Sequence, residues 1–241
     1  MASVIQLDGN TLSPAEVYAV ATDNIEVKLS EDSWNRIVKS RKVVEDILDS
    51  GEVVYGINTG FGSLVDTNIS SEHLQDLQVN LIRSHATGLG DSMSKTAVKA
   101  MMVARINSFA RGFSGVHPNV VQQLIDYVNH GVTPYIPRIG SLGASGDLAP
   151  LSHMALTLIG EGFVIDEHDN KIPTKDLLLE KGLIPVELLA KDGLSLINGT
   201  SQMLSYSILS LQILNNLLTI SDVIYCSSLE AFQGSISPAD A

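Results

Sequence analysis

The sequence predicts a mainly α-helical fold with a few short strands and one loop-rich region. Apolar residues recur at helical spacing along most of the chain, whereas the candidate strands are few and short. The chain has 241 residues, of which 44% are hydrophobic, so it can bury a large core in one or two domains. No internal repeat and no low-complexity tract interrupts this pattern. Packing of helices against helices is therefore expected to dominate.

Helices are expected where the 3.6-residue apolar period lies between start and stop signals. These helices are expected over residues 13–21, 31–49, 71–84, 95–110, 118–129, 147–159, 175–180 and 200–228. The third begins near Ser70 or Ser71 and runs towards a glycine at position 88, and Thr200 or Ser201 can cap the last.

Strands are expected over residues 26–29 and 52–55, where short apolar runs precede turn residues. A hairpin is expected to pair residues 163–166 with 171–173 through a turn at 167–170. Residues 131–146 form the longest irregular stretch, and such surface loops commonly present functional residues.

The segment from Gly193 to Ser221 contains no charged residue, and its apolar stripe is long enough to raise the question of a membrane span. Amide side chains interrupt the stripe, and no basic flank follows it. These amides are Asn198, Gln202, Gln212, Asn215 and Asn216. We therefore expect no membrane span, but a helix buried on most of its surface within a bundle or between subunits.

Composition excludes several classes of function. The formal net charge of −12 argues against a nucleic-acid surface, because phosphate binding needs clustered Lys and Arg. The single cysteine, Cys226, cannot form an internal disulfide and fits a reducing compartment. The first residues lack a basic segment followed by an apolar stretch, so a cytoplasmic protein is expected. His85 and His153 form no metal-ligand spacing with each other or with the cysteine, so no metal is expected.

Residues 143–153, Gly-Ala-Ser-Gly-Asp-Leu-Ala-Pro-Leu-Ser-His, carry the most informative pattern. If the amide nitrogen of Gly146 attacks the carbonyl carbon of Ala144, a five-membered ring closes, and loss of two waters, one taking the Ser145 hydroxyl, leaves a methylidene-imidazolone. Closure needs a tight, crowded turn, which glycine can adopt because it has no Cβ. The alternative is that Ser145 merely caps the helix beginning near Asp147.

Residues 54–62, Val-Tyr-Gly-Ile-Asn-Thr-Gly-Phe-Gly, place three glycines around Tyr55 after a short apolar run. The glycines predict a loop whose backbone comes close to a neighbour. The segment lacks the Lys-Ser/Thr ending of a phosphate-binding loop and a dinucleotide fingerprint, so phosphate binding is not expected. Without a chemical role, a tyrosine packed under a loop would explain Tyr55 equally well.

Two further segments end in polar residues. Ser84 and His85 lie in the last turn of an expected helix, where a histidine can simply complement the helix dipole. Asn198 follows an apolar run and precedes Gly199, a pair that favours a turn.

Together these segments resemble the aromatic amino acid ammonia-lyases, the family of histidine, tyrosine and phenylalanine ammonia-lyases and related aminomutases. The resemblance runs in family order from Val53 to the end of the chain and rests on residues 54–62, 80–90, 105–115, 143–153, 158–162 and 193–201. It implies a helical bundle of the aromatic amino acid lyase type. It also implies that Ala144, Ser145 and Gly146 form 4-methylidene-imidazol-5-one autocatalytically, with no dissociable cofactor.

The resemblance assigns a role to each remaining candidate residue. The tyrosine that matches Tyr55 removes a proton from the substrate β-carbon, a role that requires neighbours able to stabilise the phenolate, because a phenol ordinarily titrates near pH ~10. Asn198 is implied to hold the modified loop or the polar end of the substrate, since an amide both donates and accepts hydrogen bonds. Residues matching Ser84, His85, Gly62 and Leu142 line the substrate pocket.

The implied reaction is elimination of ammonia from an amino acid. Ser84, His85 and the sequence of residues 152–156 most resemble the corresponding segments of histidine ammonia-lyases, whose product is urocanate. An unsubstituted phenyl ring would leave this polar pair unsatisfied, so phenylalanine is disfavoured. A similar Arg-Ser-His stretch occurs in some bacterial tyrosine ammonia-lyases, so the alternatives are a tyrosine ammonia-lyase, an aminomutase of the same family, or a noncatalytic helical scaffold.

The resemblance also predicts domain organisation and assembly. Residues 1–200 are expected to form an amino-terminal lyase domain with the Ala-Ser-Gly loop, and residues 201–241 the start of the central helical bundle. The family's sequences continue for about as much again and supply another tyrosine and a carboxylate-binding arginine. We therefore expect an amino-terminal fragment that is inactive alone, with residues 144–146 intact in most molecules, and a homotetramer in the full-length form.

Overall fold

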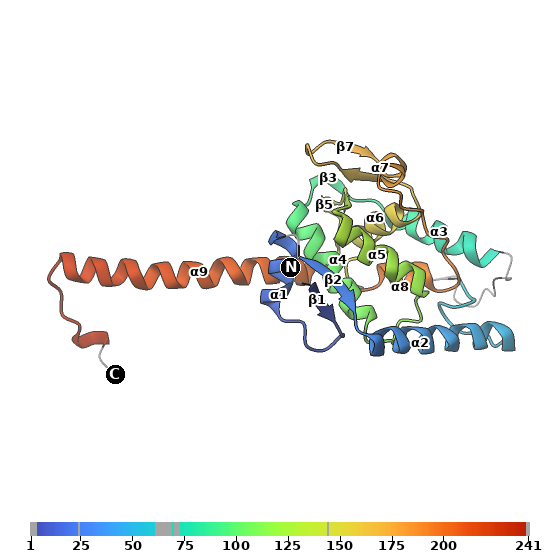
Figure 1. Cartoon of the computed structure of the whole chain (residues 1–241), viewed down its shortest axis with the longest axis horizontal. Helices are drawn as coiled ribbons and strands as arrows, with labels where there is room; N and C mark the ends of the chain where they lie inside the picture. Colours follow the sequence, from blue (N-terminus) through green and yellow to red (C-terminus); the bar gives the residue numbers. More distant parts are fainter. Residues whose placement is uncertain (1–3, 24, 61–68, 70–72, 144, 240–241) are drawn as a thin grey trace.

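The core of this chain is centred on one largely buried helix, α4 (Lys95–Phe109). The structure is a computed structural model that describes residues 4–239 except 24, 61–68, 70–72 and 144. Helix α4 packs against α1 (Pro14–Asp23), α5 (Pro118–His130) and the first turns of α9 (Ser201–Ala231), as Figure 1 shows. Its residues Met101, Met102, Ile106 and Phe109 are almost fully buried and form the centre of the core.

The remaining helices are α2 (Glu31–Ser50), α3 (Leu74–His85), α6 (Leu148–Leu158), α7 (Thr174–Glu180) and α8 (Asp192–Ile197), with a 3-10 turn at Ser237–Ala239. The predicted helices are confirmed to within a few residues at each end. The expected start of α3 near residue 71 lies outside the described residues. Sequence reasoning missed α8, because six residues within a long uncharged run show no distinct helical period.

Serine or proline begins and glycine ends two of these helices, α2 and α5. The Ser30 hydroxyl accepts a hydrogen bond from the amide of Ser33 and caps α2, and Gly51 ends that helix in the left-handed conformation. Helix α5 begins with Pro118, which has no amide hydrogen to leave unpaired, and ends at Gly131.

The described residues form three small sheets around the helices. Strand β1 (Val4–Leu7) pairs in parallel with β2 (Glu26–Leu29), and β3 (Leu89–Ser92) pairs antiparallel with β5 (Pro137–Ile139). Strand β4 (Thr133–Pro134) joins β6 (Phe163–Ile165), which forms the predicted hairpin with β7 (Lys171–Pro173). The predicted strand over 26–29 is also confirmed.

Two predictions of local structure are wrong. Residues 52–55 form no strand, because the Asn58 amide bends the chain by donating to the carbonyl of Glu52 and accepting from the amide of Val54. Residues 131–146 are not irregular throughout, because β4 and β5 lie within them. Their pairing partners are distant in sequence, so a local pattern could not reveal them.

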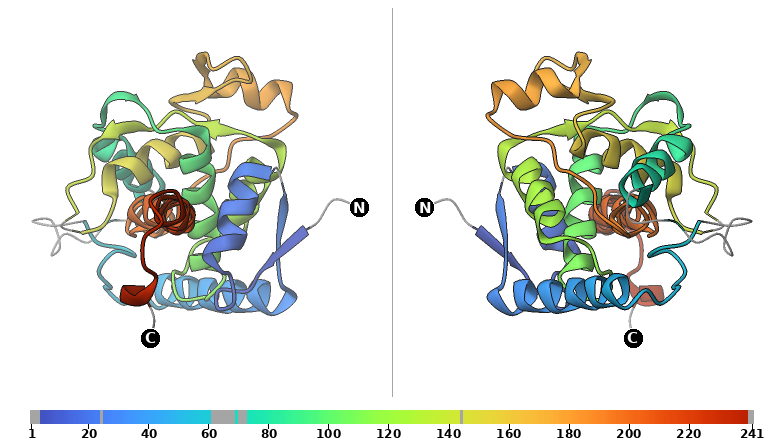
Figure 2. Two further views of the ribbon diagram at one scale, coloured as in Figure 1. Left: turned by 90° about the vertical axis from the view of Figure 1, so that its left-hand side faces the viewer. Right: turned by 90° about the vertical axis from the view of Figure 1, so that its right-hand side faces the viewer.

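Helix α9 leaves the body of the molecule. Its buried residues, Ser201, Gln202, Ser205 and Ile208, all lie in the first turns that pack on α4, and the rest projects away from the other helices. Figure 2 shows the projecting part end-on in two opposite views. Within one chain, the prediction that this helix is mostly buried is therefore wrong, because no other described segment reaches its outer turns. Burial between subunits stays a prediction.

Helix α9 is long and apolar enough to cross a membrane by length and composition alone. The same test is passed by helices that a soluble protein buries in its core, so this result is weak support for a membrane span.

Candidate active site

The loop that carries the Ala-Ser-Gly motif is fixed to the start of α9 by Asp147. The main-chain amide of Asp147 donates to the carbonyl oxygen of Gly199 over 2.7 Å. Its fully buried carboxylate accepts hydrogen bonds from the Ser141 hydroxyl at 2.9 Å and from the amides of Gln202 and Met203 at 2.8 and 3.0 Å. These amides belong to the first turn of α9, where an acidic group satisfies free donors and complements the helix dipole.

Gly146 adopts a conformation that requires glycine. Its φ is +90°, and a Cβ built at this position would overlap the carbonyl oxygen of Gly199. Ser145 beside it is exposed, and Ala144 lies outside the described residues. The structure therefore supplies the tight, crowded turn at Gly146 that ring closure needs.

Asn198 and Tyr55 both lie beside α8. Asn198 is exposed and immediately follows the last residue of this helix. Tyr55 is half-exposed in a turn, and its neighbour Gly56 packs so closely on Leu194 of α8 that a Cβ would lie 2.7 Å from the Leu194 Cδ2. Helix α8 thus supports the turn that holds the predicted base and also carries the predicted amide.

Ser84 and His85 end α3 and turn their polar atoms towards its backbone. The Ser84 hydroxyl donates to the carbonyl of Leu81 over 2.8 Å, and His85 Nδ1 lies 2.9 Å from the same oxygen. The next residues contact α6, the helix that follows the motif loop, because the amide of Gly88 donates to Nε2 of His153 over 3.0 Å. Burial lowers the pKa of His153, which favours the neutral ring that can accept this bond.

The other predicted pocket residues are less informative. Leu142 is 90% exposed in the motif loop, and Gly62 lies outside the described residues. A cavity of about 340 Å³ lies beside α8, and residues from both α4 and α8, as well as Asn198, line it. Within the described parts of the chain, no group of three or more His, Cys, Asp or Glu side chains could hold a metal ion.

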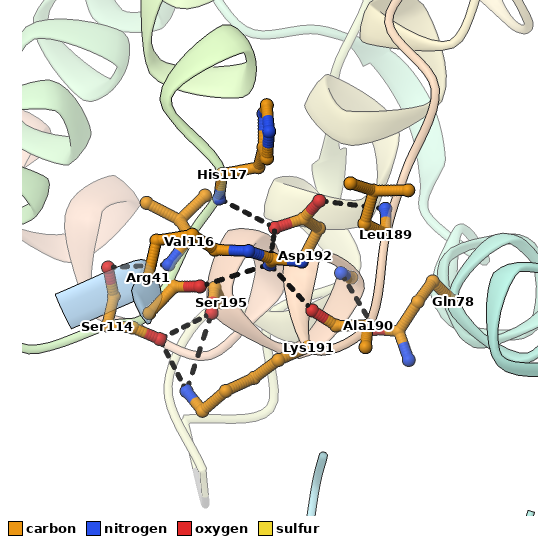
Figure 3. Close-up of polar contacts among 12 residues, drawn as sticks. Arg41, Gln78, Ser114, Val116, His117, Leu189, Ala190, Lys191, Asp192 and Ser195 are labelled. Carbon is orange, nitrogen blue, oxygen red and sulfur yellow. Dashed lines mark hydrogen bonds and ion pairs between the residues drawn. The ribbon is translucent and has the colours of Figure 1, made fainter. Parts of the chain in front are cut away.

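A buried carboxylate that sequence reasoning missed fixes the first residue of α8. Asp192 accepts hydrogen bonds from the main-chain amides of His117 and Leu189 at 2.8 Å each, and from the Arg41 guanidinium at 3.3 Å (Figure 3). Arg41 also donates to the carbonyl of Ala190. Burial raises the pKa of Asp192 to about 6, although the nearby Arg41 charge opposes the shift.

A buried arginine, also missed, fixes the other end of α8. Arg105 of α4 donates through one guanidinium nitrogen to the carbonyl oxygens of Ser195 and Asn198, and it lies 4.7 Å from the ring centroid of Phe109. Burial lowers the pKa of Arg105 to about 10, so the side chain still carries its charge near neutral pH. One signal was available in the sequence, because Arg105 is the single charged residue between positions 100 and 110.

Comparison with known proteins agrees with this arrangement. Residues 12–241 match the family model described as aromatic amino acid lyase. The chain is 44% identical to a tyrosine ammonia-lyase of Cupriavidus metallidurans over 95% of its length, and 44% identical to a histidine ammonia-lyase of Natranaerobius thermophilus over 96%. Its structure is similar to that of the histidine ammonia-lyase of Trypanosoma cruzi, with a TM-score of 0.92, 35% identity and 97% of this chain covered.

The chain spans less than half the length of these relatives: 43% of the tyrosine ammonia-lyase, 45% of the histidine ammonia-lyase and 46% of the solved structure. The mainly helical fold, the glycine turn at position 146 and the family match along almost the whole chain agree with one another. This chain belongs to the aromatic amino acid lyase family.

Proposed function

We propose that the protein containing this chain is an ammonia-lyase that eliminates ammonia from L-histidine to give urocanate. The observation that carries this proposal is the position of Gly146. Its backbone has a left-handed conformation and packs against Gly199, the residue that follows Asn198. An ordinary helix cap would tolerate a side chain at this position, whereas a backbone packed for ring closure would not.

Residues 144–146 are proposed to form 4-methylidene-imidazol-5-one, and the glycine-only space at position 146 fits that group. Once formed, the group supplies an electrophilic carbon that makes the substrate amine a better leaving group. Asn198 is proposed to orient the modified loop or the polar end of the amino acid through its amide. Tyr55 is proposed to take a proton from the substrate β-carbon.

The proposed preference for histidine rests on Ser84 and His85 at the end of α3. A polar pair suits an imidazole or phenol ring, because either ring offers hydrogen-bonding atoms that a phenyl ring lacks. Tyrosine is the second candidate substrate, since the tyrosine ammonia-lyase of Cupriavidus metallidurans is as similar to this chain as the histidine ammonia-lyase of Natranaerobius thermophilus. We further propose that the enzyme acts as a homo-oligomer in the cytoplasm.

The test uses the complete product of the gene, supplied separately with L-histidine, L-tyrosine and L-phenylalanine. We expect the absorbance of urocanate from histidine and an intact mass that is two waters below the value calculated from the sequence. Coumarate from tyrosine would support the second candidate, and a β-amino acid would identify an aminomutase. If the protein shows no turnover and no mass change, it is a noncatalytic scaffold and the proposal is overturned.

Two variants separate the electrophile from the base. Ser145→Ala removes the hydroxyl that leaves as water, so we expect neither the mass change nor turnover. Tyr55→Phe should retain the mass change and lower kcat by about 10²–10⁴-fold, the usual contribution of a positioned base. Tyr18→Phe on α1 is the matched control and should behave as the wild type. Wild-type kcat in Tyr55→Phe would show that Tyr55 is not the base.

A further inference from the structure

Helix α8 is too short to set its own position. It has six residues, and isolated helices of this length do not form stably in water. Yet the two residues that follow it matter to the proposed site. Asn198 belongs to that site, and the carbonyl of Gly199 accepts a hydrogen bond from the amide of Asp147 in the Ala-Ser-Gly loop. Their placement must therefore come from contacts between α8 and other elements.

Arg105 makes those contacts at the carboxyl end of α8. Its guanidinium donates to the carbonyl oxygens of Ser195 and Asn198. It also packs against Gly199 so closely that a Cβ there would overlap the guanidinium. One cation thus holds three consecutive features of the chain: the last turn of α8, Asn198 and Gly199.

The electrostatics indicate that these carbonyls are the partners of Arg105. The side chain is only 4% exposed, and no carboxylate pairs with it among the ion pairs of the described residues. The carboxyl end of a helix carries partial negative charge on its free carbonyls, so it can compensate a buried cation. Lysine could supply the charge but not the planar guanidinium, whose second terminal nitrogen packs against Gly199 and whose face lies near the Phe109 ring.

A short path connects this clamp to the motif loop. The carbonyl of Gly199, one residue beyond the carbonyl that Arg105 binds, accepts the amide hydrogen of Asp147. Any shift of Asn198 and Gly199 would move the acceptor against which Gly146 is packed. A merely structural arginine in the core would have no such link to the loop.

We propose that Arg105 is a positioning residue of the lyase site, which sets Asn198 and the acceptor oxygen of Gly199 against the Ala-Ser-Gly loop by clamping the end of α8. The inference rests on the proposed function for its catalytic meaning, but its structural part can be tested without activity.

The structural test measures hydrogen exchange at the Asp147 amide in the 241-residue chain. In Arg105→Gln we expect exchange to be about tenfold faster or more, because a hydrogen bond that depends on the clamp opens more often. Arg105→Lys should fall between Arg105→Gln and the wild type. Arg111→Gln is the control, since Arg111 lines the same cavity but donates to Asn10 instead.

Amides of α5 report whether an effect is only global. Equal exchange at Asp147 in Arg105→Gln and Arg111→Gln, or acceleration at Asp147 no greater than in α5, would overturn the proposal. If Arg105→Gln does not fold, Arg105→Lys allows the same comparison, because it keeps the charge and loses the planar guanidinium.

The catalytic test uses the complete gene product. Arg105→Lys should lower kcat by about tenfold or more with a smaller change in KM, and it should reduce the fraction of molecules lighter by two waters. Wild-type kcat and mass in this variant would overturn the positioning role. If the wild-type protein shows neither turnover nor the loss of two waters, the proposed function is overturned. The exchange comparison would still decide the structural role of Arg105.

Discussion

At the scale of single residues, Gly146 and Asp192 occupy environments in which the ordinary behaviour of their residue types changes. Gly146 has no room for a side chain, because the oxygen of Gly199 fills the position of a Cβ. Asp192 is a carboxylate removed from water at the first turn of α8, with three donors around it. Both residues constrain segments of the proposed site.

Replacing Gly146 with alanine should cost more stability than the same change three residues earlier. Gly143 also has a positive φ, +78°, but a Cβ there would meet no atom within 4 Å. We expect Gly143→Ala to lower the free energy of unfolding by about 1 kcal/mol through backbone strain alone. Gly146→Ala should lower it by about 3 kcal/mol or more, because overlap with Gly199 adds to that strain. Urea unfolding measures both, and equal losses would contradict the packing at position 146.

Asp192 should give the folding stability a pH dependence. Burial raises its pKa from 3.8 to about 6, so the native state binds the proton more tightly than the unfolded chain. The contribution of this group to the free energy of unfolding therefore falls as the pH rises from about 4 to 6. Asp192→Asn removes this titration while retaining an oxygen acceptor.

The measurement is urea unfolding of the wild type and Asp192→Asn across this pH range. The wild-type value minus the variant value should decrease as the pH rises. A difference that stays constant, or increases, would show that the pKa is not raised.

At the scale of elements, the sequence predicted those whose signal is local. The long helices, the strand over 26–29 and the hairpin of β6 and β7 follow from apolar period, caps and turn residues. Strands β1, β3, β4 and β5 and helix α8 were missed, because each of these strands pairs with a partner 22 or more residues away and α8 is too short. The turn replacing the expected strand at 52–55 depends on one side chain, Asn58, that bonds to the backbone.

The projecting part of α9, which follows its last buried residue Ile208, should mediate self-association. Large apolar side chains cover it, and contiguous exposed apolar surface on a helix is typical of an interface. We expect the wild-type chain to associate and the double variant Leu214→Lys, Leu217→Lys to be monomeric or nearly so, as measured by sedimentation velocity. Both leucines are more than half exposed.

The matched control is Val38→Lys, Val43→Lys on α2, where the valines are 54% and 56% exposed. This control should associate like the wild type. A wild-type chain that is monomeric at all concentrations, or equal losses in both double variants, would contradict an interface on α9.

At the scale of the whole molecule, motifs indicated which segments matter but not what holds them together. The resemblance pointed to Tyr55, Ser145, Gly146 and Asn198, and the structure packs Gly146 against Gly199, the residue that follows Asn198. The supporting residues were not predictable, because Arg41 and Asp192 are 151 residues apart and Arg105 and Asn198 are 93 apart. Buried polar contacts of this kind depend on the complete fold and leave no periodic pattern in the sequence.

The double use of Asp147 has a consequence for biosynthesis. One carboxylate closes the motif loop and also caps a helix whose donor residue Gln202 lies 55 residues later in the chain. While the ribosome is still adding those residues, the loop lacks both its acceptor on Gly199 and its donors on Gln202 and Met203. The nascent protein can therefore give this loop its final shape only after residue 203 has emerged, which delays any self-modification until the neighbouring helices have folded.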